Sequence, residues 1–312
     1  MIMLVPSFLA QQTSNYVQFL FAKGAINPAA SGTNINQKIY YTFGANRQWY
    51  QMDNAPKQTF ANFSYTIRPP RSYSYWQNIG ALVERDQAGI QSNNSFYVSY
   101  TIHLLLRKNL VASFGVYAGF RQFLQSPGII DPNDPVNQKS TYMTYSYPDL
   151  IPGLRISGRK FFFDICARQV SIEKQEDFFK HTQIGSPSRL YPTLFMSLGK
   201  VYPITDDWSA VPSVASYCTI TGIPSVNPTL MFYYANRFGL GMATRNISFV
   251  SGIFQVRVLE NLSIGMCYSY TTSRANMVAP NSYEIMVGVA PMGLGGKPVK
   301  KHSIAKCPTL EF

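Results

Sequence analysis

The sequence is poor in charged residues and has no long apolar run. Asp, Glu, Lys and Arg make up 13% of its 312 residues, against about 25% in a typical soluble domain. No apolar stretch approaches the roughly 20 residues that a membrane-spanning helix requires. The low content of charged residues leaves little surface that interacts well with water. The absence of a long apolar run excludes a helical membrane protein. If the chain spans a membrane, it must do so with β-strands, in which apolar residues alternate with small or polar ones.

Cysteine is also scarce, which limits redox and metal chemistry. The four cysteines are widely separated along the chain: Cys166, Cys218, Cys267 and Cys307. They form no CxxC pair and no regular spacing, so we predict no disulfide and no metal site. No motif indicates a cofactor.

Acidic residues are outnumbered, with 15 Asp and Glu against 27 Lys and Arg and a formal charge of +12. An excess of this size is common in proteins that bind nucleic acid. Here the basic residues are scattered along the chain and match no nucleic-acid-binding signature. We therefore expect no nucleic-acid partner.

Strict alternation of apolar with small or polar residues is the dominant pattern that is present. Between residues 95 and 106 every second residue is apolar, and Ser99 and Thr101 lie on the other face. Residues 110–120 repeat the pattern after residues 107–109, which predicts a tight hairpin. The polar face is rich in small groups and poor in Lys and Glu, as in a barrel lumen rather than the wet face of a soluble sandwich.

Repetition of this pattern predicts an all-β fold: one transmembrane, antiparallel barrel of the outer-membrane type, with about fourteen strands within residues 37–290. The predicted strands are residues 37–48, 57–67, 76–86, 94–106, 110–123, 149–158, 160–169, 190–202, 207–218, 226–235, 237–245, 248–259, 261–272 and 281–290. An even number of strands is typical of bacterial single-chain barrels.

The lengths of the connections agree with this arrangement. Outer-membrane barrels have short turns on the periplasmic side and longer loops outside. If both termini are periplasmic, the two long connections, residues 124–148 and 170–189, both fall on the outer side. The sequence therefore predicts a protein of the bacterial outer membrane, in contact with its lipid, with both termini in the periplasm.

The two ends of the chain differ from the barrel in composition. Residues 1–10 resemble the end of a signal peptide, and residues 11–36 are expected to form a periplasmic lead-in to the first strand. Residues 291–312 predict a basic periplasmic tail. Four of its lysines either dock on an acidic periplasmic partner or are simply solvated: Lys297, Lys300, Lys301 and Lys306.

No motif of a catalytic site is present. The chain contains no G-x-S-x-G, HExxH or P-loop, and no GxGxxG after a strand. Its histidines, His103, His181 and His302, are not spaced as a catalytic pair. We predict no catalytic residue and no enzyme activity, and expect His103 to hydrogen-bond to neighbours in the lumen.

Several charged residues fall on the predicted lumen face. Structural pairing across the barrel is the default interpretation, since a narrow lumen must satisfy its own charges, and a selectivity filter is the alternative. These residues are Glu84, Asp164, Arg121, Arg168, Arg257 and Glu284.

Three stretches carry a resemblance to a known family. Residues 16–19 followed by residues 26–32, of sequence INPAASG, are similar to an INPAYAG signature. Residues 47–60 resemble a second segment, RQQW…GAPKTQ. The third match consists of Asp86 and Gly89, then Tyr97 and Tyr100, and a closing strand at residues 282–286. These are motifs of the PorP/SprF family of type IX secretion system membrane proteins, found in Bacteroidetes. Ala30 and Asn54 depart from the family pattern, and residues 124–189 match nothing in it.

The resemblance marks a set of residues as possible partner contacts. They are Asn27, Pro28, Gly32, Arg47, Trp49, Asp53, Ala55, Pro56, Lys57, Asp86 and Gly89. As architecture, Asn27 and Pro28 would end the periplasmic lead-in, and Trp49 would lie at the outer membrane interface. The turn at residues 53–56 is either purely structural or a surface binding site.

The resemblance implies a non-enzymatic component of the type IX secretion and gliding machinery. Its partners would be periplasmic ring lipoproteins, the C-terminal domain of secreted cargo, or both. The alternative is a passive porin for a small solute, which would conduct ions in a planar bilayer. A lipid-modifying barrel enzyme is a third class, and it would lose its activity on His103→Ala.

Overall fold

The computed structural model describes residues 15–34, 37–69, 74–107, 109–125, 143–170, 192–219, 224–272 and 281–291. The strands are β1 (Ile39–Arg47), β2 (Lys57–Ile67), β3 (Tyr75–Ala88), β4 (Gln91–Arg107), β5 (Leu110–Gln125), β6 (Met143–Gly158), β7 (Phe161–Arg168), β8 (Thr193–Lys200), β9 (Tyr202–Pro203), β10 (Trp208–Thr219), β11 (Ser225–Tyr234), β12 (Phe238–Arg245), β13 (Phe249–Leu259), β14 (Leu262–Thr271) and β15 (Asn281–Val289). Two short helices precede them, α1 (Lys23–Ile26) and the 3-10 helix η1 (Pro28–Ala30). No helix among the described residues is long and apolar enough to span a bilayer.

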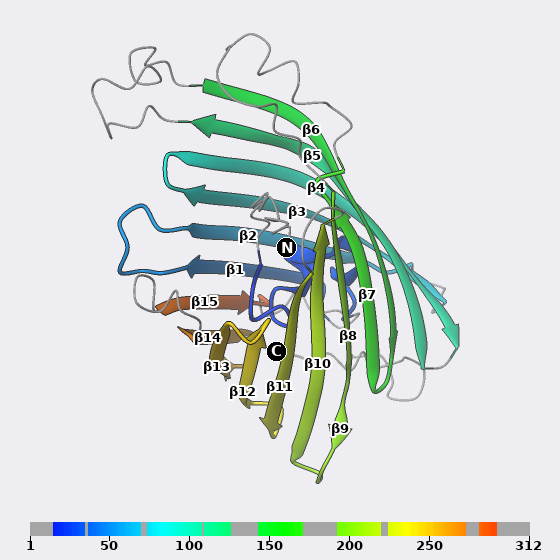
Figure 1. The fold of residues 1–312 in the computed structure, drawn as a ribbon. Helices are drawn as coiled ribbons and strands as arrows, with labels where there is room; N and C mark the ends of the chain where they lie inside the picture. Colours follow the sequence, from blue (N-terminus) through cyan, green and yellow to red (C-terminus); the bar gives the residue numbers. More distant parts are fainter. Residues whose placement is uncertain are drawn as a thin grey trace, which may run out of the picture.

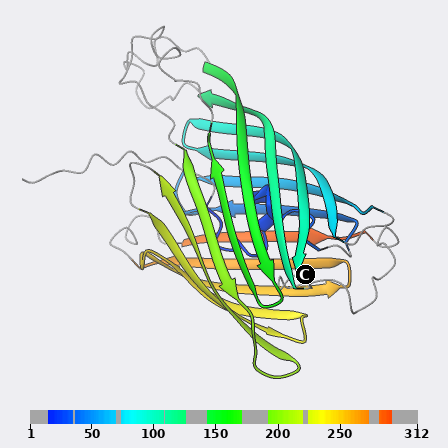
Figure 2. The ribbon, with the colours of Figure 1, turned by 90° about the vertical axis from the view of Figure 1, so that its right-hand side faces the viewer.

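The strands form one antiparallel sheet that closes on itself (Figures 1 and 2). Apart from the two-residue β9, each strand pairs with the next strand along the sequence: β8 pairs with β10, β10 pairs with β11, and β1 pairs with β15 to complete the ring. The two-residue β9 follows β8 and pairs with the start of β10. The protein is therefore a closed barrel of 14 antiparallel strands, as the alternation predicts.

All fourteen predicted strands are present, and the largest difference from the predicted bounds is at the start of β6. β6 begins at Met143, whereas the sequence pattern starts it at residue 149. Residues 143–148 were not predicted as strand because they include Pro148, and proline lacks an N–H and is rare within strands. In the structure Pro148 lies opposite Phe120 of β5.

The two faces of the barrel differ as the alternation requires. On β4, the outward-facing Val98 and Tyr100 are 55% and 47% exposed, while Thr101 and His103 are fully buried. The same contrast recurs around the ring. An apolar outer band next to a polar interior is what a bilayer demands of a barrel.

The barrel has two distinct ends. At one end, which we call the long-connection end, β5 leads to β6 across residues 126–142 and β7 leads to β8 across residues 169–192. The other end, the short-turn end, carries tight turns such as residues 159–160 and 260–261. β1 starts and β15 finishes at the short-turn end, in agreement with the predicted alternation of connection lengths.

The N-terminal segment lies inside the barrel (Figure 1). Residues 15–34, which we call the plug, contribute many of the most buried side chains of the protein, among them Tyr16, Phe19 and Ile26. The sequence places residues 11–36 ahead of the barrel as a lead-in; the described part instead fills the lumen. Its apolar side chains explain this, because they pack against lumen-facing aromatic residues such as Phe60.

Candidate functional site in the barrel lumen

The INPAA stretch forms the centre of the plug. Asn27 caps η1 by accepting a hydrogen bond from Ala29 N at 3.0 Å, and Pro28 occupies the first helical position, where its missing N–H costs nothing. The amide of Asn27 also donates to Leu154 O and to Asp164 Oδ1, both at 3.1 Å. One asparagine therefore shapes the plug and fixes it to the wall.

Glycines on the wall make room for this turn. A Cβ on Gly115 of β5 would lie within 2.7 Å of the backbone at Pro28 and Ala29. A Cβ on Gly153 of β6 would meet Asn27 and Pro28. Only glycine lets the plug approach the strands so closely.

Two lumen carboxylates hold the plug directly. Glu284 of β15 accepts hydrogen bonds from Val17 N at 2.9 Å and Gln18 N at 3.1 Å. Asp164 of β7 accepts from Asn27, and its second oxygen lies 2.6 Å from Arg155 Nη1. Charge-assisted bonds of this kind are stronger than neutral ones, so these carboxylates act as fixed anchors for plug backbone and side chain.

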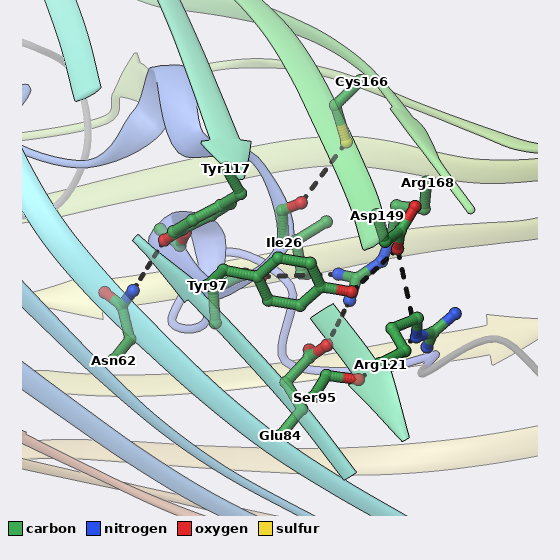
Figure 3. Close-up of polar contacts among 12 residues, drawn as sticks. Ile26, Asn62, Glu84, Ser95, Tyr97, Tyr117, Arg121, Asp149, Cys166 and Arg168 are labelled. Atoms are coloured by element: carbon green, nitrogen blue, oxygen red, sulfur yellow. Dashed lines mark hydrogen bonds and ion pairs between the residues drawn. The ribbon is translucent and has the colours of Figure 1, made fainter. Parts of the chain in front are cut away.

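An ion pair crosses the lumen next to the plug (Figure 3). Arg168 Nη2 of β7 lies 2.6 Å from Glu84 Oε2 of β3, although three strands separate β3 and β7 in the sheet. Arg168 Nη1 also donates to Ala25 O of the plug at 3.4 Å. The cross-section is therefore spanned by side chains at this level.

A second set of polar groups surrounds the same level (Figure 3). Tyr97 OH donates to Asp149 Oδ2 at 2.8 Å, and Arg121 Nε lies 4.0 Å from the same oxygen. On another side of the plug, Tyr117 OH donates to Gly24 O and accepts from Asn62, both at 2.7 Å. Structural pairing is the default interpretation of the sequence for the lumen charges as a group, and these contacts agree with it. Glu84 and Arg168 both belong to the predicted group, whereas Asp164 and Arg121 pair with Arg155 and Asp149, which lie outside it.

Two small cavities lie beside the plug. One cavity, lined in part by Lys23, Tyr40 and Asn62, measures about 60 Å³, and another, beside Asn27 and Arg155, about 10 Å³. Spaces of this size hold a few water molecules at most. They do not amount to a passage for a solute.

His103 has a structural environment. Its Nδ1 lies 2.7 Å from Ser113 Oγ, and its ring stacks on Trp76 at 4.9 Å. Both His103 and Ser113 are fully buried, so this pair has no access to a substrate. Within the described ranges, no cluster of His, Cys, Asp or Glu could hold a metal ion.

The predicted contact residues separate into two places. Asn27, Pro28 and Gly32 lie in the plug. The rest gather at the long-connection end around residues 48–56 and Gly89, together with the start of β15; we call this group the rim cluster. Its members from the predicted set are Arg47, Trp49, Asp53, Ala55, Pro56, Lys57, Asp86 and Gly89.

Backbone hydrogen bonds hold the rim cluster together. Gly89 N donates to Asn54 O at 3.0 Å, and Tyr50 N donates to Asn281 O at 3.2 Å. Trp49, Asn54 and Gly89 all have positive φ, a conformation that sharp turns require and that favours Gly and Asn. Asp53 remains exposed on its surface.

Several predicted sites lie outside the described residues: the apolar segment 1–10 and the four lysines of the C-terminal tail. The barrel residues that contact the plug were not predicted from the sequence. One of them is Thr101 of β4, which donates to Pro28 O at 2.8 Å. A usable signal was the apolar character of residues 16–30, which a solvated lead-in does not need.

Comparison with known proteins agrees with this architecture. The profile of the family "Type IX secretion system membrane protein PorP/SprF" matches residues 8–289. The chain belongs to the PorP/SprF family. No curated protein matches the chain.

Two solved structures of outer-membrane barrels show similarity to this chain. The toluene transporter TbuX of Ralstonia pickettii has a TM-score of 0.50 and 9% identity, and the match covers 84% of this chain and 90% of that one. The toluene transporter TodX of Pseudomonas putida has a TM-score of 0.48 and 8% identity, over 90% of this chain and 93% of that one. At such identities TbuX supports the fold alone.

Proposed function

We propose that this PorP/SprF protein is a closed, non-enzymatic anchor in the outer membrane for the type IX secretion machinery. The observation that carries the proposal is the plug, because a lumen crossed by residues 15–34 and by the Glu84–Arg168 pair has no use as a passage in this state. What such a barrel offers instead is a rigid platform whose two ends can bind other proteins. Membership in the PorP/SprF family is the reason we assign the protein to the type IX secretion machinery.

The rim cluster is the surface we assign to the partner. It gathers eight of the eleven family-motif residues at one end, in a connection whose backbone is fixed by hydrogen bonds to Asn281 and Ser282. Short periplasmic turns and long outer connections orient barrels in the outer membrane, so this end faces the cell exterior. Secreted cargo, held through its C-terminal domain, is therefore the partner we favour.

Co-purification tests the proposal. The tagged protein is extracted from outer membranes in mild detergent, and bound proteins are identified by mass spectrometry, for the wild type, Asp53→Ala and the matched control Asp206→Ala. Both aspartates are exposed, but Asp53 lies in the rim cluster and Asp206 in a connection at the opposite end. We expect a surface protein with a C-terminal sorting domain in the wild-type and Asp206→Ala eluates, reduced for Asp53→Ala.

Other outcomes have a clear meaning. Periplasmic ring lipoproteins in place of cargo would assign the binding role to the inner face and count against the rim cluster. An eluate without partners would favour the porin alternative, for which a conducting lumen is the signature.

A further inference from the structure

The contacts of the plug follow one direction along the barrel. At its N-terminal end, Asn15 Nδ2 donates to Ser225 Oγ at 3.2 Å, and Asn15 Oδ1 accepts from Asn227 at 2.9 Å. Ser225 is the first residue of β11, and Arg245, which donates to Asn15 O at 3.1 Å, is the last of β12. These strand ends lie at the long-connection end.

The opposite end of the plug lies at the other mouth. Trp76 Nε1 donates to Gly32 O at 2.9 Å, and Trp76 is the second residue of β3, at the short-turn end. Between the two ends, further partners lie at intermediate positions on their strands. Glu284, the fourth residue of β15, holds Val17, and Tyr117 in the middle of β5 holds Gly24.

Chain length permits such a crossing with slack. An extended chain reaches about 3.3 Å per residue, so the plug could span roughly 60 Å, against an apolar band about 25 Å tall. The slack is taken up by α1 and η1. The ordered contacts at Asn15, Glu284 and Trp76 cannot all form if the segment folds in and returns to the same mouth.

We infer that the N-terminal segment is threaded through the whole barrel, with its Asn15 end presented at the cell surface and its Gly32 end at the periplasmic mouth. The Asn15 end of the plug would then lie on the outer side of the membrane, whereas the sequence predicts that residues 11–36 are periplasmic. A threaded plug also brings its Asn15 end to the mouth that carries the rim cluster. It becomes part of the surface that an exterior polypeptide partner meets, and it is withdrawn from periplasmic partners.

Cysteine labelling in intact cells tests the threading. The background carries Cys218→Ser and Cys307→Ser, since Cys166 and Cys267 are buried. Asn15→Cys is compared with two markers: Ile247→Cys, 85% exposed between β12 and β13, and Asp206→Cys, exposed at the short-turn end. Each is treated with a membrane-impermeant maleimide, before and after the outer membrane is permeabilised.

We expect Asn15→Cys to be labelled in intact cells together with Ile247→Cys, while Asp206→Cys needs permeabilisation. Because Asn15 is only partly exposed, an epitope inserted just ahead of it is probed with antibody in parallel. Labelling of Asn15 and the epitope together with Asp206→Cys, or labelling of neither before denaturation, would overturn the inference. The result does not depend on any partner, so it is distinguishable from failure of the proposed function.

Discussion

Replacing Gly115 by alanine should loosen the plug without harming the barrel. The new Cβ would lie within 2.7 Å of Ala29 N, Pro28 C and Thr101 Oγ1, and two of these atoms are plug backbone that cannot rotate away. Overpacking of a close contact costs about 1–3 kcal/mol. Because alanine is no worse than glycine within a strand, this cost falls on the seating of the plug.

A free-energy cost of that size raises the fraction of molecules with a displaced plug by roughly 5- to 150-fold. Trypsin cleavage after Lys23, inside the plug, measures it, since cleavage follows the open population when opening is fast. The matched control is Gly252→Ala on β13, where a Cβ meets nothing within 4 Å. Gly252→Ala should cleave at the wild-type rate.

The reasoning fails if Gly115→Ala is cleaved no faster than wild type while its barrel is intact, as judged by heat-modifiable migration on a detergent gel. It fails equally if Gly252→Ala accelerates cleavage as much, because the effect would then come from the strands and not from the plug.

Three further substitutions probe the lumen and the outer face. Arg168→Met leaves the buried Glu84 without its partner and should destabilise the protein by about 3–5 kcal/mol, measured as a lower temperature of heat-modifiable unfolding. Adding Glu84→Gln should restore most of this stability. An equal loss of stability in the double variant would contradict the Glu84–Arg168 pairing. Asn27→Ala removes the η1 cap and an Asp164 partner, so faster tryptic release of the plug is expected, with a cost of about 1–3 kcal/mol; unchanged release would show that the cap is dispensable. Leu240→Arg places a charge on the outer face, where Leu240 is 62% exposed, and should cost about 2–4 kcal/mol if lipid surrounds it; a neutral result in refolding into lipid would argue against a lipid-facing site.

Sequence periodicity predicts the barrel well for a physical reason. Each strand contacts lipid on one face, so alternation is imposed on every strand, and all fourteen were found. It fails locally where a residue breaks the pattern, as Pro148 does at the start of β6.

The plug could not be predicted in this way. It is surrounded by protein on all sides, so its apolar residues follow no period of two, and its anchors are distant in sequence: Glu284 is 267 positions from Val17. Gly115 and Gly153 lie where the plug contacts the strands, but a glycine within a strand can have several structural roles, so these two did not predict the contact. The INPAASG stretch was recognised as a motif, while its place in the lumen became visible only with the wall around it.

Ion conductance tests the account most directly. The purified protein is reconstituted in a planar bilayer and compared with a variant that lacks the plug residues up to Asn34. The account predicts a silent wild type and steady, large channels for the shortened variant. Charge selectivity should be weak, because the four buried acidic residues of the described lumen are nearly balanced by three buried arginines. Steady conductance of the wild type at the level of the shortened variant would contradict a barrel closed by its own N-terminal segment.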